Sequence, residues 1–357
     1  MIKDLTKKIE KHKSFLELKE VNRPLRGCCI GGWENMSRYI NETDRFLRKG
    51  SLYIEDIDAA DFIDIYTRYA DSLNYDDDFI RTIEPFQSIP WTESAIGCNM
   101  NYTGKNIWSE PINYSIDEAY FKIINEDENA SIKKYGEFLD FLGVNFAGNY
   151  PIGQAILRGP LDMAAAAVGE QNMIYNMIDR PNEMKKFISL CADIFKSFLK
   201  VHSEKSPEFS GGRVIGQYYI WTPGTCARLQ EDVMSLLSRD FYLDFAMECD
   251  LGIAKSVQYS LFHLHASAFF LLDFVLRNEG IKIIQVSKDE GNTKLSDMIE
   301  GLQKIQAAGK CLLLKGRFTK EDYDTIGKKL DKQGLCVQVV VDSVSEADEA
   351  LKAIDSM

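Results

Sequence analysis

The chain has 357 residues, 45% apolar and 27% charged, which is the composition of a globular protein with a substantial core. Its formal net charge of −12 argues against nucleic acid or an anionic membrane as the main partner. Residues 1–8 lack the apolar core of a signal peptide, and no stretch approaches the roughly 18 apolar residues of a membrane span. The eight cysteines have no paired spacing, so we expect reduced thiols and a cytoplasmic protein.

The first third of the chain predicts a helical extension, one strand and an irregular segment. Residues 1–24 have a helical pattern that ends at Arg23-Pro24, because proline disfavours helix in the residue before it. A short strand is expected at 26–30, followed by an acidic, helix-like stretch at 40–84. That stretch includes Asp76-Asp77-Asp78, which we interpret as a solvated face or loop. Residues 85–112 hold three prolines and two tryptophans, a pattern typical of a lid or a pocket wall.

The rest of the chain alternates strands with helices. We expect strands at 152–157, 214–221, 253–264, 281–286, 311–315 and 336–342. We expect helices at 161–177, 181–203, 231–251, 267–278, 294–308 and 320–333, with capping boxes at Thr319–Asp322 and Ser343–Glu346.

This alternation predicts parallel βα units, with seven strands counted and an eighth expected within 87–102. No Gly-rich phosphate turn follows the first strand, which favours an α/β fold of the (β/α)8 TIM-barrel type over an open doubly wound sheet. No repeat or low-complexity linker divides residues 1–357. We therefore predict one domain, with 1–24 as an N-terminal helical extension.

Two of the four histidines, His263 and His265, lie two residues apart at the end of a predicted strand. On a strand, residues i and i+2 point the same way, so both imidazoles are expected to face one direction. This arrangement suits a two-point metal chelate or a polar substrate clamp, and a pair of packed core histidines is the alternative.

Active sites of TIM barrels lie at the C-terminal ends of the strands, and this chain has many polar and aromatic residues there. If a metal binds, the two imidazoles need a third ligand, for which we favour a carboxylate, Asp342, over Asp289, Glu290 and Cys336. Tyr218 is also expected in an aromatic wall suited to a planar or methoxy-bearing substrate, although core filling is the alternative for any one aromatic residue. The predicted catalytic residues are His263, His265, Gln285 and Asp342; the predicted substrate-binding residues are Trp33, Trp91, Arg158, Tyr219, Trp221, Asp289 and Lys315.

Several segments resemble the uroporphyrinogen decarboxylase superfamily, which includes the haem-pathway decarboxylase and zinc-dependent methyltransferases that exchange methyl groups with corrinoid proteins. The matching segments are Arg23-Pro24, Ile89–Cys98, Arg158–Asp162, Arg180-Pro181, Trp221–Gly224, Gln230–Asp232 with Ser238, His263–His265 and Ile284–Val286. They follow the family's order, and the resemblance covers roughly residues 20–350. The resemblance implies a TIM barrel with its pocket at the C-terminal ends of the strands.

The resemblance also separates the branches of the superfamily. The decarboxylase places tandem arginines after its first strand to hold many carboxylates, whereas this chain keeps only Arg38-Tyr39 there, which argues against the haem-pathway activity. The methyltransferases carry a His-x-Cys pair after their fifth strand and a cysteine near the chain's end. His263 and His265 take the place of that pair, and Asp342 lies near the position of the last cysteine. Imidazole and carboxylate ligands still suit zinc, and they favour an ether or amine substrate over a thiol.

We therefore expect a zinc-dependent methyltransferase-like enzyme that moves a methyl group from a small O- or N-methylated substrate to a corrinoid. The chain lacks an Asp-x-His-x-x-Gly signature, so the cobalamin is expected on a partner protein. One alternative is a metal-free decarboxylase that uses Arg158, Lys315 and the histidines as its cationic surface. Another is a non-catalytic ligand-binding homologue. The oligomeric state stays open, with a homodimer through helical faces as one arrangement.

Overall fold

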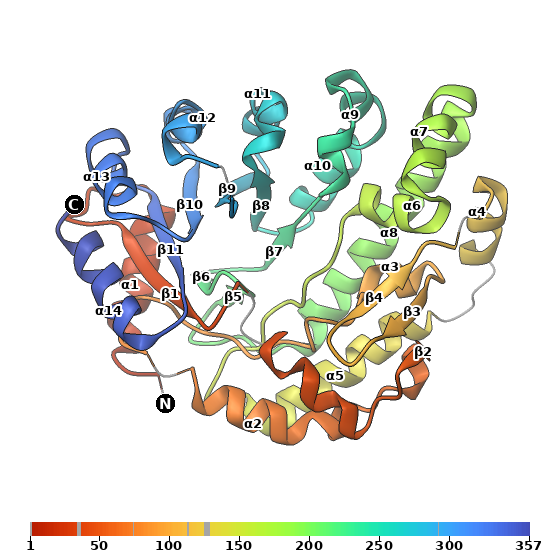
Figure 1. The fold of residues 1–357 in the computed structure, drawn as a ribbon, viewed down its shortest axis with the longest axis horizontal. Helices are drawn as coiled ribbons and strands as arrows, with labels where there is room; N and C mark the ends of the chain where they lie inside the picture. Colours follow the sequence, from red (N-terminus) through yellow and green to blue (C-terminus); the bar gives the residue numbers. More distant parts are fainter. Residues whose placement is uncertain (1, 34–36, 74, 113, 125–128, 292) are drawn as a thin grey trace.

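A six-stranded parallel sheet curls around the centre of the molecule (Figure 1). The computed structural model describes residues 1–357 except 1, 34–36, 74, 113, 125–128 and 292. In the order in which they pair, the strands are β1 (Leu25–Ile30), β11 (Leu335–Val341), β10 (Cys311–Gly316), β9 (Ile281–Lys288), β8 (Tyr259–His265) and β7 (Cys226–Leu229).

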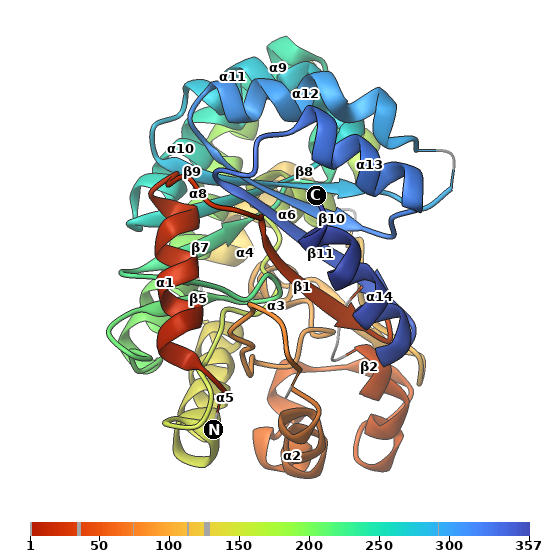
Figure 2. The ribbon, with the colours of Figure 1, turned by 90° about the vertical axis from the view of Figure 1, so that its left-hand side faces the viewer.

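The convex side of this sheet is covered by helices that follow its strands (Figures 1 and 2). They are α9 (Arg239–Phe245), α10 (Met247–Lys255), α11 (Leu272–Arg277), α12 (Leu295–Ala307), α13 (Lys320–Lys329) and α14 (Val344–Asp355). Short 3-10 helices η4 (Val233–Leu236) and η5 (Ala266–Leu271) follow β7 and β8 directly. Among the described helices, none has the length and apolar character that crossing a membrane requires.

The remaining elements belong neither to the six-stranded sheet nor to the helices that cover its convex side. The helices are α1 (Leu5–Leu16), α2 (Ile63–Asp71), α3 (Trp91–Ala95), α4 (Ile116–Ile124), α5 (Ala130–Phe146), α6 (Pro160–Val168), α7 (Glu170–Asp179) and α8 (Pro181–Lys205), with 3-10 helices η1 (Ser37–Arg45), η2 (Ile54–Asp56) and η3 (Ala59–Phe62). The small antiparallel sheets are β2 (Gly50–Leu52) with β3 (Asn99–Tyr102) and β4 (Ile107–Glu110), and β5 (Arg213–Ile215) with β6 (Ile220–Thr222).

The interior of the curled sheet changes from apolar to polar along the strands. Outward residues such as Phe262 and Ile284 join the core beneath the helices, whereas inward residues such as Leu261 and Ile283 join a separate inner cluster. Nearer the C-terminal ends, the aligned inward row reads His265, Ser287, Lys315 and Gln338 across β8, β9, β10 and β11. Since side chains alternate along a strand, this polar row lies at the same end of the sheet as the histidine pair.

The predicted strands at 26–30, 281–286, 311–315 and 336–342 are confirmed. The strand predicted at 253–264 is confirmed only from Tyr259 to the histidine pair, because residues 253–255 end helix α10. The capping box at Thr319 is confirmed as well. Its hydroxyl accepts a hydrogen bond from the Asp322 backbone N–H, and the Asp322 carboxylate accepts one from the Thr319 N–H. Ser343 caps α14 through Glu346 N. Local patterns therefore located the strands and helix starts of residues 281–357 well, whereas the helix predicted at 231–251 is divided among η4, α9 and α10.

The eight strands of a full barrel are not confirmed, because six of the strands in the described residues form the parallel sheet. Residues 152–157 contribute only an isolated bridge from Ile152 to Ile83. Residues 214–221 form parts of the β5–β6 hairpin, whose chain reverses through the left-handed residues Gln217 and Tyr219. The strand expected within 87–102 is β3, which belongs to the antiparallel β2–β3–β4 sheet.

Side chains occupy the hydrogen-bonding edges of β1 and β7 where further strands would pair. Asp77 and Asp78 accept the backbone N–H groups of Cys28 and Arg26, at 3.0 and 3.1 Å. The Gln154 amide makes two bonds to the backbone of Arg228 on β7, accepting from N at 3.0 Å and donating to O at 3.1 Å. Unpaired edge groups are costly when buried, so these side chains take over the role of a neighbouring strand.

The acidic run at 76–78 is therefore not the uniform solvated face that we expected. Asp77 and Asp78 are buried, whereas the Asp76 side chain is 82% exposed. Asp78 binds Arg23 and Lys11. Burial raises the pKa of the Asp78 carboxyl, but the hydrogen bonds from these two cations outweigh burial and lower it to about 2.

We expect Asp78 to make the protein acid-sensitive. Because its folded-state pKa is depressed, its stabilising contribution is present above the ordinary pKa of about 4 and is lost as the pH falls toward 2. The contribution is of the order of 2 kcal/mol. Urea unfolding of the wild type and Asp78→Asn at pH 6, 4 and 3 should show a stability difference that shrinks with acid. A difference that is constant over this range would contradict the assignment.

Candidate metal centre

The two histidines converge on one point at the C-terminal end of β8. His263 Nε2 and His265 Nε2 lie 3.1 Å apart. The opposite nitrogen of each ring is occupied: His263 Nδ1 meets Gln285 Oε1, and His265 Nδ1 meets Asp289 Oδ1 at 2.8 Å. Amide and carboxylate oxygens accept hydrogen bonds, so these partners assign the ring proton to Nδ1 in both histidines. Each Nε2 then presents a lone pair toward the other, an arrangement that requires a shared cation or proton.

A third acceptor joins them from the neighbouring strand. Asp232 follows the end of β7, and its Oδ1 lies 3.9 Å from His265 Nε2. Asp232, His263 and His265 each offer one ligand atom within 4.8 Å of the others. Asp232 Oδ1 is buried and has no hydrogen-bond partner among the described residues, while Oδ2 accepts from Gln230. A buried polar atom is rarely left unpaired. Two imidazole nitrogens and one carboxylate oxygen form a ligand set typical of catalytic zinc.

The surroundings shift the pKa values of the two imidazoles in opposite directions. Burial lowers the pKa of His263 well below its ordinary value, and the positive charge of Arg228 adds to this. The hydrogen bond to Asp289 raises the pKa of His265 despite partial burial. His263 is thus held in the neutral form that metal binding requires, and Asp289 orients His265 in the way that outer carboxylates commonly orient zinc-binding histidines.

Buried carboxyl groups behind Asp232 hold its loop in place. The backbone N–H groups of Asp232 and Val233 donate to the Asp162 carboxylate at 3.1 and 2.9 Å. Glu231 in turn accepts from the N–H of Leu161 and Asp162 at the start of α6. Burial raises the pKa of Asp162, and the nearby charge of Asp232 raises it further. These reciprocal bonds lock the loop after β7 against α6.

The structure places several predicted site residues around this cluster. Gln285 and Asp289 contact His263 and His265, as described. Lys315 is buried on β10, where its Nζ donates to the Trp33 carbonyl at 2.9 Å. The Trp33 indole N–H donates to Glu290 at 2.9 Å. Trp33 therefore lies on the rim near the pair rather than in contact with it.

Asp342, predicted as the third metal ligand, does not join the histidines. It lies at the end of β11, three strands from β8 in the sheet, and its exposed carboxylate binds Arg317 through both oxygens at 3.1 and 2.7 Å. In the structure the third acceptor is Asp232, because β7 and not β11 is the neighbour of β8 on its open side.

The other predicted substrate residues have partners elsewhere. Trp91 fills the core against Tyr135 and Phe138. The Tyr219 hydroxyl meets that of Tyr69 at 3.3 Å, and Trp221 packs near α1, where its backbone N–H donates to His12 Nδ1. Arg158 forms an ion pair with Glu93. Trp91 and Trp221 are therefore core residues, which was the alternative to a role in substrate binding.

The sequence did not predict two residues of the site, Asp232 and Arg228, and it predicted the role of Tyr218 only in part. Asp232 and Arg228 belong to β7 and its end, and a four-residue strand is too short for its periodicity to be recognised. Tyr218 was expected only as part of an aromatic wall, yet its hydroxyl donates to Gln285 Oε1 at 2.8 Å. The segment Gln230–Asp232, noted for its resemblance, was the one available signal.

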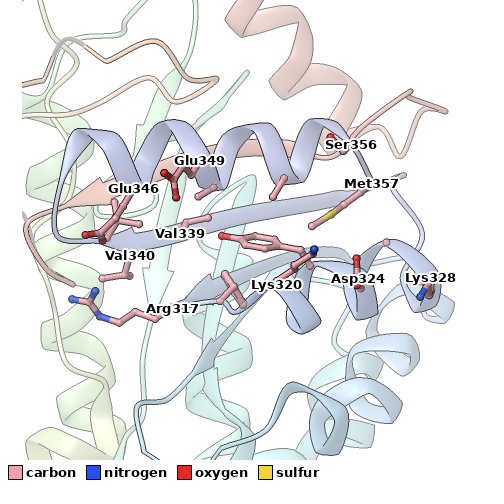
Figure 3. Close-up of a pocket in the computed structure, with 16 residues that line it drawn as sticks. Arg317, Lys320, Asp324, Lys328, Val339, Val340, Glu346, Glu349, Ser356 and Met357 are labelled. Atoms are coloured by element: carbon pink, nitrogen blue, oxygen red, sulfur yellow. The ribbon is translucent and has the colours of Figure 1, made fainter.

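A hollow of about 770 Å³ lies away from the histidines, between α13 and α14 (Figure 3). Its lining includes Arg317, Tyr323, Val339, Glu349 and Met357. Val339 points outward from β11 into the core beneath the helices, whereas His263 points inward toward Tyr218. The sheet therefore separates this hollow from the metal-binding cluster.

Comparison with known proteins identifies the fold. No family model and no curated protein sequence matches the chain. Among solved structures, a methyltransferase from Methanosarcina mazei matches 98% of this chain and 98% of its own length, with a TM-score of 0.62 and 12% identity. The chain thus shares the overall fold of that protein along nearly its entire length.

Proposed function

We propose that the protein is a metal-dependent, methyltransferase-like enzyme whose metal is held by Asp232, His263 and His265. The observation that carries the proposal is the pair of Nε2 atoms 3.1 Å apart beside the buried Asp232 Oδ1, which has no hydrogen-bond partner among the described residues. Zinc fits this ligand set, because borderline-soft imidazole and a carboxylate are common zinc ligands. The shared fold with a methyltransferase supports the class of reaction.

The chain's own residues orient the ligands and leave one side open. Gln285 is fixed at both ends of its amide, because Oε1 accepts from Tyr218 and Nε2 donates to Ser287 Oγ at 3.1 Å. This fixed amide holds His263, and Asp289 holds His265. The side chains of His265, Asp232 and Asp289 are each more than a third exposed, so the cluster opens toward solvent on that side. A zinc ion bound there would supply Lewis acidity toward the heteroatom of a small O- or N-methylated substrate.

The methyl acceptor that we propose is the cobalt of a corrinoid on a separate protein. The open side of the cluster is bordered by η4 and η5, the elements that follow Asp232 and the histidines. Leu236 on η4 and Phe270 on η5 are 53% and 45% exposed. Exposed apolar side chains on the elements that directly follow the metal-binding residues support a protein partner on that side of the cluster.

The two alternatives make different use of the site. A metal-free decarboxylase would use the histidines as cations, together with Lys315 and Arg158, but Arg158 is paired with Glu93 and Asp232 has no role in that reaction. A ligand-binding homologue would use the same pocket without turnover and would show only stabilisation by ligand. The converging acceptors therefore favour the metal-dependent reading.

Methyl transfer to free cob(I)alamin tests the proposal. Zinc-loaded protein is incubated with a panel of methoxy and methylamine compounds, and formation of methylcobalamin is followed by its visible spectrum. We expect transfer from at least one compound, dependent on zinc and abolished in His263→Ala/His265→Ala. Release of carbon dioxide from carboxylated compounds by the metal-free protein would favour the decarboxylase instead.

A further inference from the structure

Two cationic side chains are buried beside His263 with only neutral groups in contact. Arg228 is 4% and Lys315 is 2% exposed. Arg228 donates to Gln230 Oε1 and, at 3.5 Å, to the Tyr218 hydroxyl, while its Nη1 is buried with no hydrogen-bond partner in the described part of the chain. Lys315 donates to the Trp33 carbonyl. Neither cation has a carboxylate oxygen within ion-pair distance among the described residues.

Both cations flank the same aromatic ring. Arg228 Cζ lies 5.6 Å and Lys315 Nζ 5.4 Å from the centre of the Tyr218 ring. The Tyr218 hydroxyl lies 3.3 Å from His263 Nδ1. The two positive charges therefore lie on the inner side of the metal-binding cluster, next to His263.

The acidic groups of this region are already engaged elsewhere. Asp232 accepts from Gln230 through Oδ2 and has Oδ1 3.9 Å from His265 Nε2, and Asp289 meets His265 Nδ1. Glu84 is near enough for the Arg228 charge to act on it, but its carboxylate accepts hydrogen bonds from Thr82, Gln87 and the Gln217 N–H. The guanidinium Nη1 and the spare donors of Lys315 are thus left for an external acceptor.

We propose that Arg228 and Lys315 form a carboxylate-binding subsite, so that the substrate is a small methylated carboxylic acid. A buried cation is costly unless an anion pairs with it, and a guanidinium matches a carboxylate in geometry. The carboxylate would accept from Arg228 Nη1 and Lys315 Nζ. The methylated heteroatom would then lie toward Asp232, His263 and His265. The subsite stands on these contacts alone, whereas the methylated part of the substrate rests on the proposed function.

A matched pair of probes tests the subsite without any variant. Calorimetric titration of zinc-loaded wild-type protein compares methoxyacetate with methoxyacetamide, which differ in charge but little in size. We expect the acid to bind at least about tenfold more tightly, the gain typical of hydrogen bonds to a charged group. Equal binding of the two probes would overturn the proposal.

Single substitutions test whether Arg228 and Lys315 cause the preference for the acid over the amide. Arg228→Gln and Lys315→Met are expected to reduce it strongly, whereas Arg180→Gln, at an exposed residue paired with Asp117, should retain it. Thermal unfolding of the ligand-free variants separates binding from structure. Loss of an unpaired buried cation should leave the melting temperature unchanged or higher. A preference that survives both substitutions would refute the subsite.

The same titration in His263→Ala/His265→Ala distinguishes the two proposals. If the subsite is correct and the metal-dependent function is wrong, the acid preference persists in this variant and the wild type transfers no methyl group. If methyl transfer occurs but acid and amide bind equally, the subsite fails and the proposed function stands.

Discussion

The His263→Ala/His265→Ala variant is expected to lose the zinc that the wild-type protein binds, about one ion per chain. The physical reason is that the two Nε2 atoms, 3.1 Å apart, supply most of the nitrogen and oxygen donors of the cluster. Removing them leaves Asp232 with no convergent partner. Inductively coupled plasma mass spectrometry of protein purified without a His-tag measures the metal content. Wild-type protein that stays free of metal after incubation with zinc would contradict the proposed function.

The identity of the third ligand is tested by a pair of carboxylate variants. Asp232→Asn is expected to weaken zinc binding, because it removes the negative charge of the one acid in the cluster. Asp342→Asn is the matched control and should retain zinc, since Asp342 binds Arg317 instead. Asp289→Ala, which removes the orienting partner of His265, should weaken binding by about 10–100-fold. Loss of zinc in Asp342→Asn with retention in Asp232→Asn would reverse our assignment.

The Asp77→Asn substitution is expected to lower the free energy of unfolding by about 3–5 kcal/mol. Asp77 binds the Arg81 guanidinium through both oxygens, and the side chains of Arg81 and Asp77 are 6% and 0% exposed. Its carboxylate also accepts the N–H groups of Cys28 and Phe79. Neutralising the acid leaves Arg81 charged and buried without a counterion. Urea denaturation near neutral pH measures the loss.

Asp76→Asn is the control for this prediction, one residue away in the same acidic run. Its side chain is 82% exposed and meets Lys3 at 3.5 Å, with Lys3 itself 75% exposed. Exposed ion pairs contribute little, so we expect a change within about 0.5 kcal/mol. Similar losses for the two variants would mean that the burial of Asp77 does not determine its contribution.

This contrast illustrates why the acidic run was misread from the sequence. Three consecutive aspartates have the composition of a solvated loop, and nothing in their spacing distinguishes Asp76 from Asp77. The distinction arises because residues 77–81 run along the unpaired edge of β1, where the Cys28 N–H and the Arg81 guanidinium need acceptors. Cys28 is 49 residues from Asp77 along the chain and Arg81 is four residues from it. Only the folded chain brings both partners to Asp77.

The sequence by itself determined the features that depend on local periodicity. Apolar runs located β9, β10 and β11, Thr319 and Ser343 marked the starts of α13 and α14, and the two-residue spacing placed both imidazoles on one side of β8. These features follow from the geometry of a single strand or helix turn. They need no knowledge of which elements are neighbours.

Only the tertiary structure decided which residues complete the site. Asp232 reaches the histidines because β7 pairs with β8, and Arg228 and Lys315 meet at Tyr218 because the β5–β6 hairpin lies inside the curled sheet. Asp342 has the same residue type as Asp232 and also ends a strand, yet its strand lies three positions away. Strand order and the path of a hairpin are set by contacts between distant segments, and such contacts leave no periodic trace in the sequence.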